Sequence, residues 1–334
     1  MRKIVRWALR LVVVFCAVAI TFVIAFNLSP RPGVWLVNVA FDYFTAQTNK
    51  ALLQHVPHDV HTVSGIPYTQ RWPSLKMDVH RPSVVGGKTW PTVVWVHGGA
   101  WVSGRKEDIA SYLKVLAAQG FTVVGVDYTL APDAQHPAQV QQVNDALAFL
   151  QSTEARKLGI DSSQIFLAGD SAGAQIAGQL ANSIAVPDYA QSLGFKPSVA
   201  SAQLKGAVLF CGPFDMEMVR LDGAFGAFLR VVLWSFVGQK NFSGHPALHQ
   251  ASVLRHVTNR FPPTFISAGN GDPLLPHSKA LSEKLQGLTV PVDALFFDVD
   301  LRPPLGHEYQ FDLNRPEGRL ALDRLTAFLK RHSH

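Results

Sequence analysis

A serine between two glycines is the clearest candidate for chemistry in this sequence. Residues 169–173 read Gly-Asp-Ser-Ala-Gly, which has the form G-x-S-x-G. Between a strand and a helix, this pattern forms a sharp turn that lifts the serine hydroxyl out of a sheet. An apolar run at 164–168 precedes it and an alanine-rich stretch follows it. The pattern therefore predicts Ser171 as a nucleophile, and the alternative is a glycine-rich turn whose serine caps a helix.

A glycine pair after another apolar run could supply hydrogen-bond donors. Residues 97–101 read His-Gly-Gly-Ala-Trp and follow a run that ends at Val96. Glycines allow backbone N–H groups to face a ligand, and such donors stabilise the oxyanion of a tetrahedral intermediate. We therefore expect Gly98, Gly99 and Ala172, the residue after the serine, to form an oxyanion hole. An ordinary tight turn is the alternative.

A serine hydroxyl needs a base that takes its proton, and that base needs an orienting carboxylate. His307 follows the last apolar run by a short loop, and Asp272 follows the run before it. The order Ser, Asp, His along the chain is the one that goes with G-x-S-x-G. We expect Ser171, Asp272 and His307 to be catalytic, with Asp298 and Asp300 as alternative acids.

Strands and helices alternate along most of the chain. Strands are expected at 60–68, 75–80, 92–96, 121–126, 164–168, 206–210, 264–268 and 292–297. Helices are expected at 106–118, 137–150, from the serine turn through Leu180, and at 316–332. This alternation predicts an α/β fold with a mostly parallel, doubly wound sheet, and chemistry at the carboxyl ends of its strands.

About fifty residues separate the strands at 206–210 and 264–268, which is long for a simple connection. We expect a cap insertion at about 213–260. Residues 224–237 within it are apolar on most faces, which is typical of a buried helix. This helix either packs on the core as part of the cap, or lines an acyl pocket or touches a membrane. The residues expected in the substrate pocket are Trp101, Tyr128, Phe228 and Trp234.

Residues 1–30 have the pattern of a membrane anchor. Four cations lie within the first ten residues, and the run from Leu11 to Phe26 contains Thr21 as its one polar residue. A helix of about 20 residues spans the hydrocarbon core of a bilayer. The positive-inside rule places the N-terminus in the cytoplasm and the catalytic domain outside it, in the periplasm if the organism is a bacterium. A cleaved signal peptide and a buried core helix are the alternatives.

The anchor is expected to be followed by a linker with an amphipathic helix at 31–58 and by the catalytic domain at 59–334. Of the 30 basic residues, four lie in 1–30, which leaves 26 against 24 acidic residues in the rest. That near-balance argues against a nucleic-acid partner. Neither a zinc-type Cys/His spacing nor a glycine-rich phosphate loop is visible, so no metal and no cofactor are expected.

Together these residues resemble the α/β-hydrolase superfamily, and within it the hormone-sensitive-lipase-like carboxylesterases and the related feruloyl-esterase and kynurenine-formamidase-like hydrolases. The matching segments are 97–101, 127–132, 169–173, 272–274 and 306–307, spread over roughly residues 60–330. The resemblance implies a triad of Ser171, Asp272 and His307, with Asp170 supporting it and His97 bracing the glycine loop. Ala100 departs from the usual H-G-G-G loop, and so do the residues after Pro132.

The sequence thus predicts a membrane-anchored serine hydrolase that cleaves small or lipophilic carboxylic esters through an acyl-enzyme. Its expected partners are a small-molecule ester and the lipid bilayer. With the same machinery, an amide, a formamide, or acetyl or feruloyl groups on a polysaccharide are alternative substrates. A catalytically silent binding module is the alternative outside enzymes.

Overall fold

The structure is a computed structural model that describes residues 2–83 and 89–333. Within these residues, one sheet has the strand order β1-β2-β4-β3-β5-β6-β7-β8. Its strands are β1 (Val60–Pro67), β2 (Lys76–Pro82), β3 (Trp90–Val96), β4 (Thr122–Val126), β5 (Ile160–Asp170), β6 (Leu204–Phe210), β7 (Thr264–Ala268) and β8 (Val292–Phe296). β2 pairs antiparallel with both β1 and β4, and the other pairs of neighbouring strands in this sheet are parallel. The predicted mostly parallel α/β sheet is confirmed.

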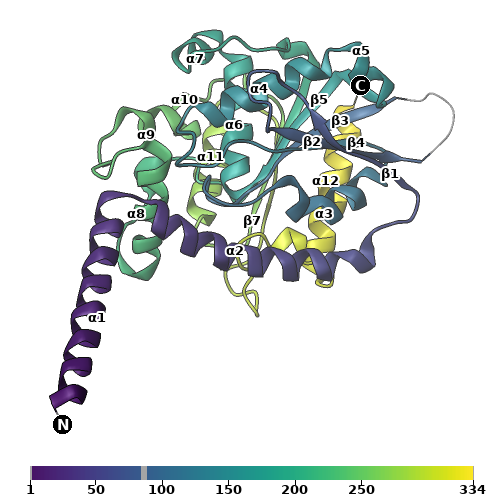
Figure 1. The fold of residues 1–334 in the computed structure, drawn as a ribbon. Helices are drawn as coiled ribbons and strands as arrows, with labels where there is room; N and C mark the ends of the chain where they lie inside the picture. Colours follow the sequence, from purple (N-terminus) through teal and green to yellow (C-terminus); the bar gives the residue numbers. More distant parts are fainter. Residues whose placement is uncertain (1, 84–88, 334) are drawn as a thin grey trace.

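Helices cover both faces of the sheet (Figure 1). The helices of the described residues, including α1, which does not cover the sheet, are α1 (Arg2–Leu28), α2 (Arg31–Leu52), α3 (Ala110–Ala117), α4 (Ala138–Leu150), α5 (Thr153–Lys157), α6 (Ser171–Ala185), α7 (Pro187–Ser192), α8 (Gly223–Val237), α9 (Pro246–Ala251), α10 (Val253–His256), α11 (Leu275–Gly287) and α12 (Pro316–His332). Side chains of β3 alternate between two cores. Val94 and Val96 join α4 and α6, and Val93 and Trp95 join α3 and α12. Burial on both faces explains the continuous apolar run of this strand.

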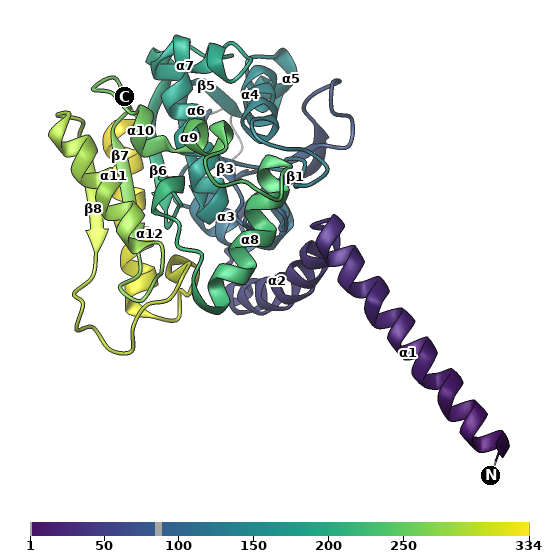
Figure 2. The ribbon, with the colours of Figure 1, turned by 90° about the vertical axis from the view of Figure 1, so that its left-hand side faces the viewer.

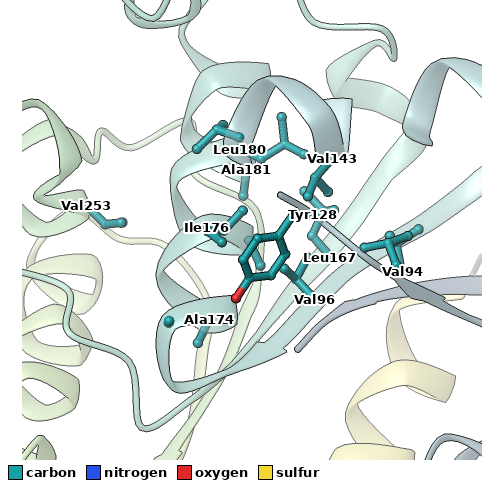
Figure 3. Close-up of a cluster of buried hydrophobic side chains, with 14 of the residues drawn as sticks. Val94, Val96, Tyr128, Val143, Leu167, Ala174, Ile176, Leu180, Ala181 and Val253 are labelled. Carbon is teal, nitrogen blue, oxygen red and sulfur yellow. The ribbon is translucent and has the colours of Figure 1, made fainter. Parts of the chain in front are cut away.

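Figure 3 shows part of the core on the side of α4 and α6. Val96 of β3, Leu167 of β5 and Ile176 of α6 lie together there, and all are buried. Tyr128, which follows β4, is buried among these apolar side chains. The strands and the helix next to the candidate catalytic residues are therefore packed into a buried apolar core.

Most elements lie close to the predicted ranges, and β7 and α12 have the predicted bounds. The strand expected at 164–168 starts earlier, at Ile160, because β5 continues its pairing with β3 beyond a register shift next to Pro91. The helix expected at 106–118 is divided into a 3₁₀ turn, Lys106–Ile109, and α3. The division of the chain into anchor, linker and catalytic domain stays a prediction.

α1 projects away from the sheet, and α2 runs along the side of the domain from which α1 leaves (Figures 1 and 2). Residues Lys3–Leu28 are long and apolar enough to cross a membrane, and none of the most apolar stretch is buried. α2 lies within residues 31–58, the segment expected to contain an amphipathic helix. In the cap segment, α8 is buried along its C-terminal half, whereas Phe225 near its start is exposed.

Lys106 joins the start of α3 to the sheet. Its side chain is buried, and Nζ lies 3.5 Å from Asp78 Oδ1 and 3.6 Å from Asp127 Oδ2. Removing the ammonium leaves a buried carboxylate without its counter-charge. We expect Lys106→Met to lower the free energy of unfolding by about 3 kcal/mol, measured by urea denaturation in detergent. Lys279→Met, at an exposed position, is the control, and equal stability of the two variants would contradict this role.

Candidate active site

Ser171 is the first residue of α6 and directly follows β5. Its φ of 51° lies in the left-handed region, which is costly for a residue with a side chain and common at functional turns. The two flanking glycines are required by close contact. A Cβ on Gly173 would lie 2.0 Å from the carbonyl oxygen of Val96, and one on Gly169 would lie 2.5 Å from the carbonyl carbon of Gly173. The G-x-S-x-G sequence therefore forms the predicted elbow.

The structure brings Ser171, His307 and Asp272 together. His307 Nδ1 lies 2.9 Å from Asp272 Oδ2, and His307 Nε2 lies 2.9 Å from Ser171 Oγ. A carboxylate can only accept, so Nδ1–H donates to Asp272 and Nε2 accepts from the serine hydroxyl. Asp272 Oδ1 also accepts from the backbone N–H of Leu274, which holds the carboxylate in place.

Asp272 follows β7 and His307 follows β8, at the carboxyl ends of neighbouring parallel strands. The alternative acids, Asp298 and Asp300, are exposed and are not hydrogen-bonded to His307. Among Asp272, Asp298 and Asp300, Asp272 is thus the one that is hydrogen-bonded to His307.

The surroundings of His307 alter its basicity. Burial lowers the pKa of His307, but neighbouring Cys211, Asp272 and Glu308 raise it, and the pKa ends well above the ordinary 6.5. Burial raises the pKa of the Cys211 thiol to about 11, so this sulfur is uncharged at neutral pH. The hydrogen bond to Asp272 is a cause of the raised pKa of His307 that does not depend on the charge of this thiol.

In the glycine loop, one of the predicted oxyanion donors, the amide of Gly98, donates to another residue. The N–H of Gly98 donates to Asp170 Oδ2 at 2.8 Å, and Trp95 Nε1 donates to Asp170 Oδ1 at 2.7 Å. Gly98 was expected to supply an oxyanion donor, but its amide is already engaged. Within the described residues, the amides of Gly99 and Ala172 have no protein acceptor.

Ala100, which replaces the third glycine of the usual loop, has a φ of 52°. Its amide also has no acceptor within the described part of the chain, and its side chain lines the cavity described below. Ala100 therefore has a left-handed backbone conformation, which glycine adopts easily, and its methyl group lies in the cavity that Ser171 also lines. This conformation costs a residue other than glycine about 1–2 kcal/mol.

Sequence reasoning assigned no role to Glu308 or Cys211. Glu308 has a φ of 58°, and its Oε1 lies 3.8 Å from His307 Nε2. Burial, followed by the charge of Glu308, raises the pKa of Asp170 well above its usual value. The only sequence signal for Glu308 was its position next to the histidine.

Tyr128 was expected in the substrate pocket, and the structure places it elsewhere. Its ring stacks on His97, with centroids 4.4 Å apart, and its hydroxyl donates to the carbonyl oxygen of His97 at 3.1 Å. His97 Nδ1–H donates to the carbonyl oxygen of Gly98 at 2.7 Å. Both rings thus support the glycine loop from behind, which agrees with the bracing role expected for His97.

A cavity of about 850 Å³ opens at Ser171 and His307. Apolar side chains dominate its lining: Phe41, Ala100, Trp101, Ala172, Pro213, Met216, Met218, Val219, Phe225, Phe228, Leu229, Val232, Leu233, Pro273, Leu274 and Pro276. The polar residues that line it are Ser171, Glu217, Arg220, His277 and His307. Trp101 and Phe228 therefore line the cavity as expected.

Trp234 does not line this cavity. Phe225, Phe228, Leu229 and Val232 recur at spacings of three and four, so they share one face of α8. Trp234 lies six residues after Phe228, on another face, where Lys240 Nζ sits 5.4 Å from its ring centroid. Phe41 of α2 lines the cavity instead, although no sequence pattern singled it out.

Within the described residues, one group of His, Cys, Asp or Glu side chains offers clustered ligand atoms for a metal. Cys211, Asp272 and His307 place these atoms within 4.8 Å of one another. Both ring nitrogens of His307 take part in the hydrogen bonds described above. The donor set therefore matches a proton-transfer site better than a metal centre.

The fold is that of the α/β-hydrolases. Esterase B from Lactobacillus rhamnosis superposes with a TM-score of 0.75 at 23% identity, covering 90% of this chain and 96% of its own. A family model described as BD-FAE matches residues 77–285, which is more than half of the chain. The chain therefore belongs to the BD-FAE family.

The chain is also similar to two relatives from Mycobacterium tuberculosis. Carboxylesterase NlhH is 30% identical over 280 residues, which cover 81% of this chain and 80% of NlhH. Esterase LipC is 31% identical over 227 residues, which cover 65% of this chain and 53% of LipC. The chain thus spans about half the length of LipC.

The raised pKa of His307 predicts a particular pH profile. His307 is a base only when neutral, so kcat/KM for an ester should fall as the pH drops through a midpoint above 6.5. Asp272→Asn removes the carboxylate that raises this pKa. We expect the acid limb to move to lower pH and kcat to drop by about 10⁴-fold. Asp298→Asn is the matched control, and an acid limb that stays in place in Asp272→Asn would disprove the assignment.

Proposed function

We propose that this protein is a serine carboxylesterase. The observation that carries the proposal is the hydrogen-bonded line from Ser171 Oγ through His307 to Asp272, with 2.9 Å at each link, at a mostly apolar cavity. NlhH, a relative that matches most of the chain, is a carboxylesterase. This supports ester hydrolysis as the reaction.

In this mechanism, His307 Nε2 takes the proton of Ser171 as Oγ attacks the ester carbonyl carbon. The amides of Gly99, Ala100 and Ala172 are the free donors for the resulting oxyanion. Each such donor contributes about 2.7–4 kcal/mol of transition-state stabilisation. The alcohol leaves with the proton from His307, water adds to the acyl-enzyme by the same route, and the acid is released.

The shape and lining of the cavity favour lipophilic esters. Phenylalanine, leucine, valine and methionine side chains line it, and they suit an alkyl or aryl acyl group. A polysaccharide-linked ester would require several hydrogen-bonding groups around the sugar. The few polar residues of the lining, of which Glu217 is already paired with Arg255 at 2.8 Å, do not favour that alternative.

We also propose that α1 is a retained membrane anchor with a cytoplasmic N-terminus and an extracytoplasmic catalytic domain. The apolar side chains of α1 are exposed along the helix, and its cations gather at its start. The end of α1 contacts the cap region, because Lys240 Nζ donates to Asn27 Oδ1 at 2.9 Å and to its carbonyl oxygen at 3.0 Å.

Labelling of the serine tests the reaction class. A fluorophosphonate probe should label the wild-type protein and should not label Ser171→Ala, because only an activated hydroxyl is phosphonylated. Hydrolysis of p-nitrophenyl acetate should fall by about 10⁶-fold in the variant. An aryl formamide assayed in parallel separates esterase from formamidase. Faster turnover of the formamide, or full labelling of Ser171→Ala, would refute the proposal.

Phe228 and Trp234 provide a matched pair of variants for the acyl site. Phe228 lines the cavity, whereas Trp234 faces away from it on the same helix. If an octanoyl chain contacts Phe228, the Phe228→Ala substitution removes about 1–2 kcal/mol of the free energy that burial of this chain contributes. We therefore expect the octanoate-to-acetate ratio of kcat/KM to fall about tenfold, with little change in Trp234→Ala. Equal ratios in both variants would exclude α8 from the acyl site.

A further inference from the structure

α2 carries a second apolar face that no part of the described chain covers. Its inner face packs on the domain through Gly33, Val34 and Leu52, which are buried. Away from these contacts, α2 exposes 65% of Trp35, 51% of Leu36, 54% of Val39, 64% of Tyr43 and 66% of Phe44. We name these five residues the outer face of α2. An exposed apolar patch of this kind marks an interaction site.

The place of α2 in the chain indicates what covers this face. α1 ends at Leu28 and α2 begins at Arg31, so only Ser29 and Pro30 separate the two helices. α2 turns away from the axis of α1 and follows the underside of the domain (Figures 1 and 2). Where α1 leaves a bilayer, α2 therefore starts at the bilayer surface.

The composition of the outer face suits a lipid interface. Trp35 and Tyr43 combine an apolar ring with a polar edge, the type of side chain enriched at the boundary between headgroups and acyl chains. Leu36, Val39 and Phe44 can enter the acyl region below it. A helix with such a face lies in the plane of the interface with its apolar side buried.

The same helix forms part of the catalytic cavity. Phe41 lines the cavity and stacks on Phe228 of α8, with ring centroids 6.1 Å apart and an interplanar angle of 14°. Gly33 lies so close to α8 that a Cβ there would be 2.8 Å from Val231. Phe225, which is 46% exposed, also lines the cavity. α2 and the rim of the cavity are therefore packed directly against each other.

We propose that the outer face of α2 lies in the outer leaflet interface, so that the cavity between α2 and α8 receives its ester from the bilayer. The substrate is then a lipophilic ester that partitions into membranes, and its acyl chain enters past Phe41 and Phe225. This inference rests on the proposed esterase activity and on the retention of α1. The outer face of α2 then contacts lipid rather than another protein.

A location experiment tests the docking without any substrate. The full chain, with Cys16→Ser, is reconstituted in phosphatidylcholine vesicles and labelled with the fluorophore NBD at Phe44→Cys. Gln191→Cys on α7 is the control, because α7 lies at the end of the domain opposite α1 (Figures 1 and 2). Spin-labelled lipid should quench the label at 44, and aqueous iodide should quench the label at 191.

Two results would overturn the docking. One is iodide quenching at position 44 as strong as at position 191. The other is a label at 44 that is shielded from both quenchers and transfers energy between copies, which would assign the face to a second molecule of this chain.

An activity experiment then tests delivery of the substrate. In the full chain, Val39→Gln combined with Tyr43→Gln should lower turnover of vesicle-borne methylumbelliferyl palmitate about tenfold, because less apolar area is buried at the interface. Turnover of soluble p-nitrophenyl acetate should be unchanged. Leu320→Gln on α12, also an exposed apolar residue, is the matched control and should change neither rate.

The two failures are distinguishable. An unchanged rate on vesicle-borne palmitate in the α2 variant overturns delivery from the bilayer and leaves the esterase proposal intact. Absence of p-nitrophenyl acetate turnover in the unmutated protein overturns the proposed function itself, and the quenching result still decides the docking.

Discussion

The contact between the start of α6 and the end of β3 leaves no space for a side chain, and the site depends on this contact. Gly173 lies against the carbonyl oxygen of Val96, where even a methyl group would be 2.0 Å away. This approach places Ser171 beside the glycine loop that follows β3. It also requires the left-handed backbone at Ser171, which stays populated because the surrounding core holds both segments.

Buried carboxylates then organise the groups around the serine. Asp272 orients His307 and raises its pKa, and Asp170 joins the loop after β3 to the elbow after β5. A buried carboxylate is stable only where donors satisfy it. Asp170 takes the amide of Gly98 and the indole of Trp95 for that purpose. The amides that remain for an oxyanion are consequently those of Gly99, Ala100 and Ala172.

Two helices shape the cavity: α2, which precedes the first strand, and α8, which lies between β6 and β7. α8 supplies most of one wall, and α2 adds Phe41 from a part of the chain that lies before the first strand. α2 contacts α8 through Gly33 and Val231, and Lys240, just after α8, contacts Asn27 near the end of α1. The wall of the cavity and the proposed membrane anchor are therefore connected by packing rather than by the candidate catalytic residues.

The sequence by itself determined the order of strands and helices, the elbow at Ser171, and Asp272 and His307 as its partners. These follow from local patterns: buried strands read as apolar runs, the elbow requires glycines, and reactive groups follow the carboxyl ends of strands. Only the tertiary structure decided that Gly98 serves Asp170, that Tyr128 lies behind the loop, and that Phe41 replaces Trp234 at the cavity. The reason is physical: the partner of a polar group, and the face that a side chain presents, depend on neighbours from distant segments.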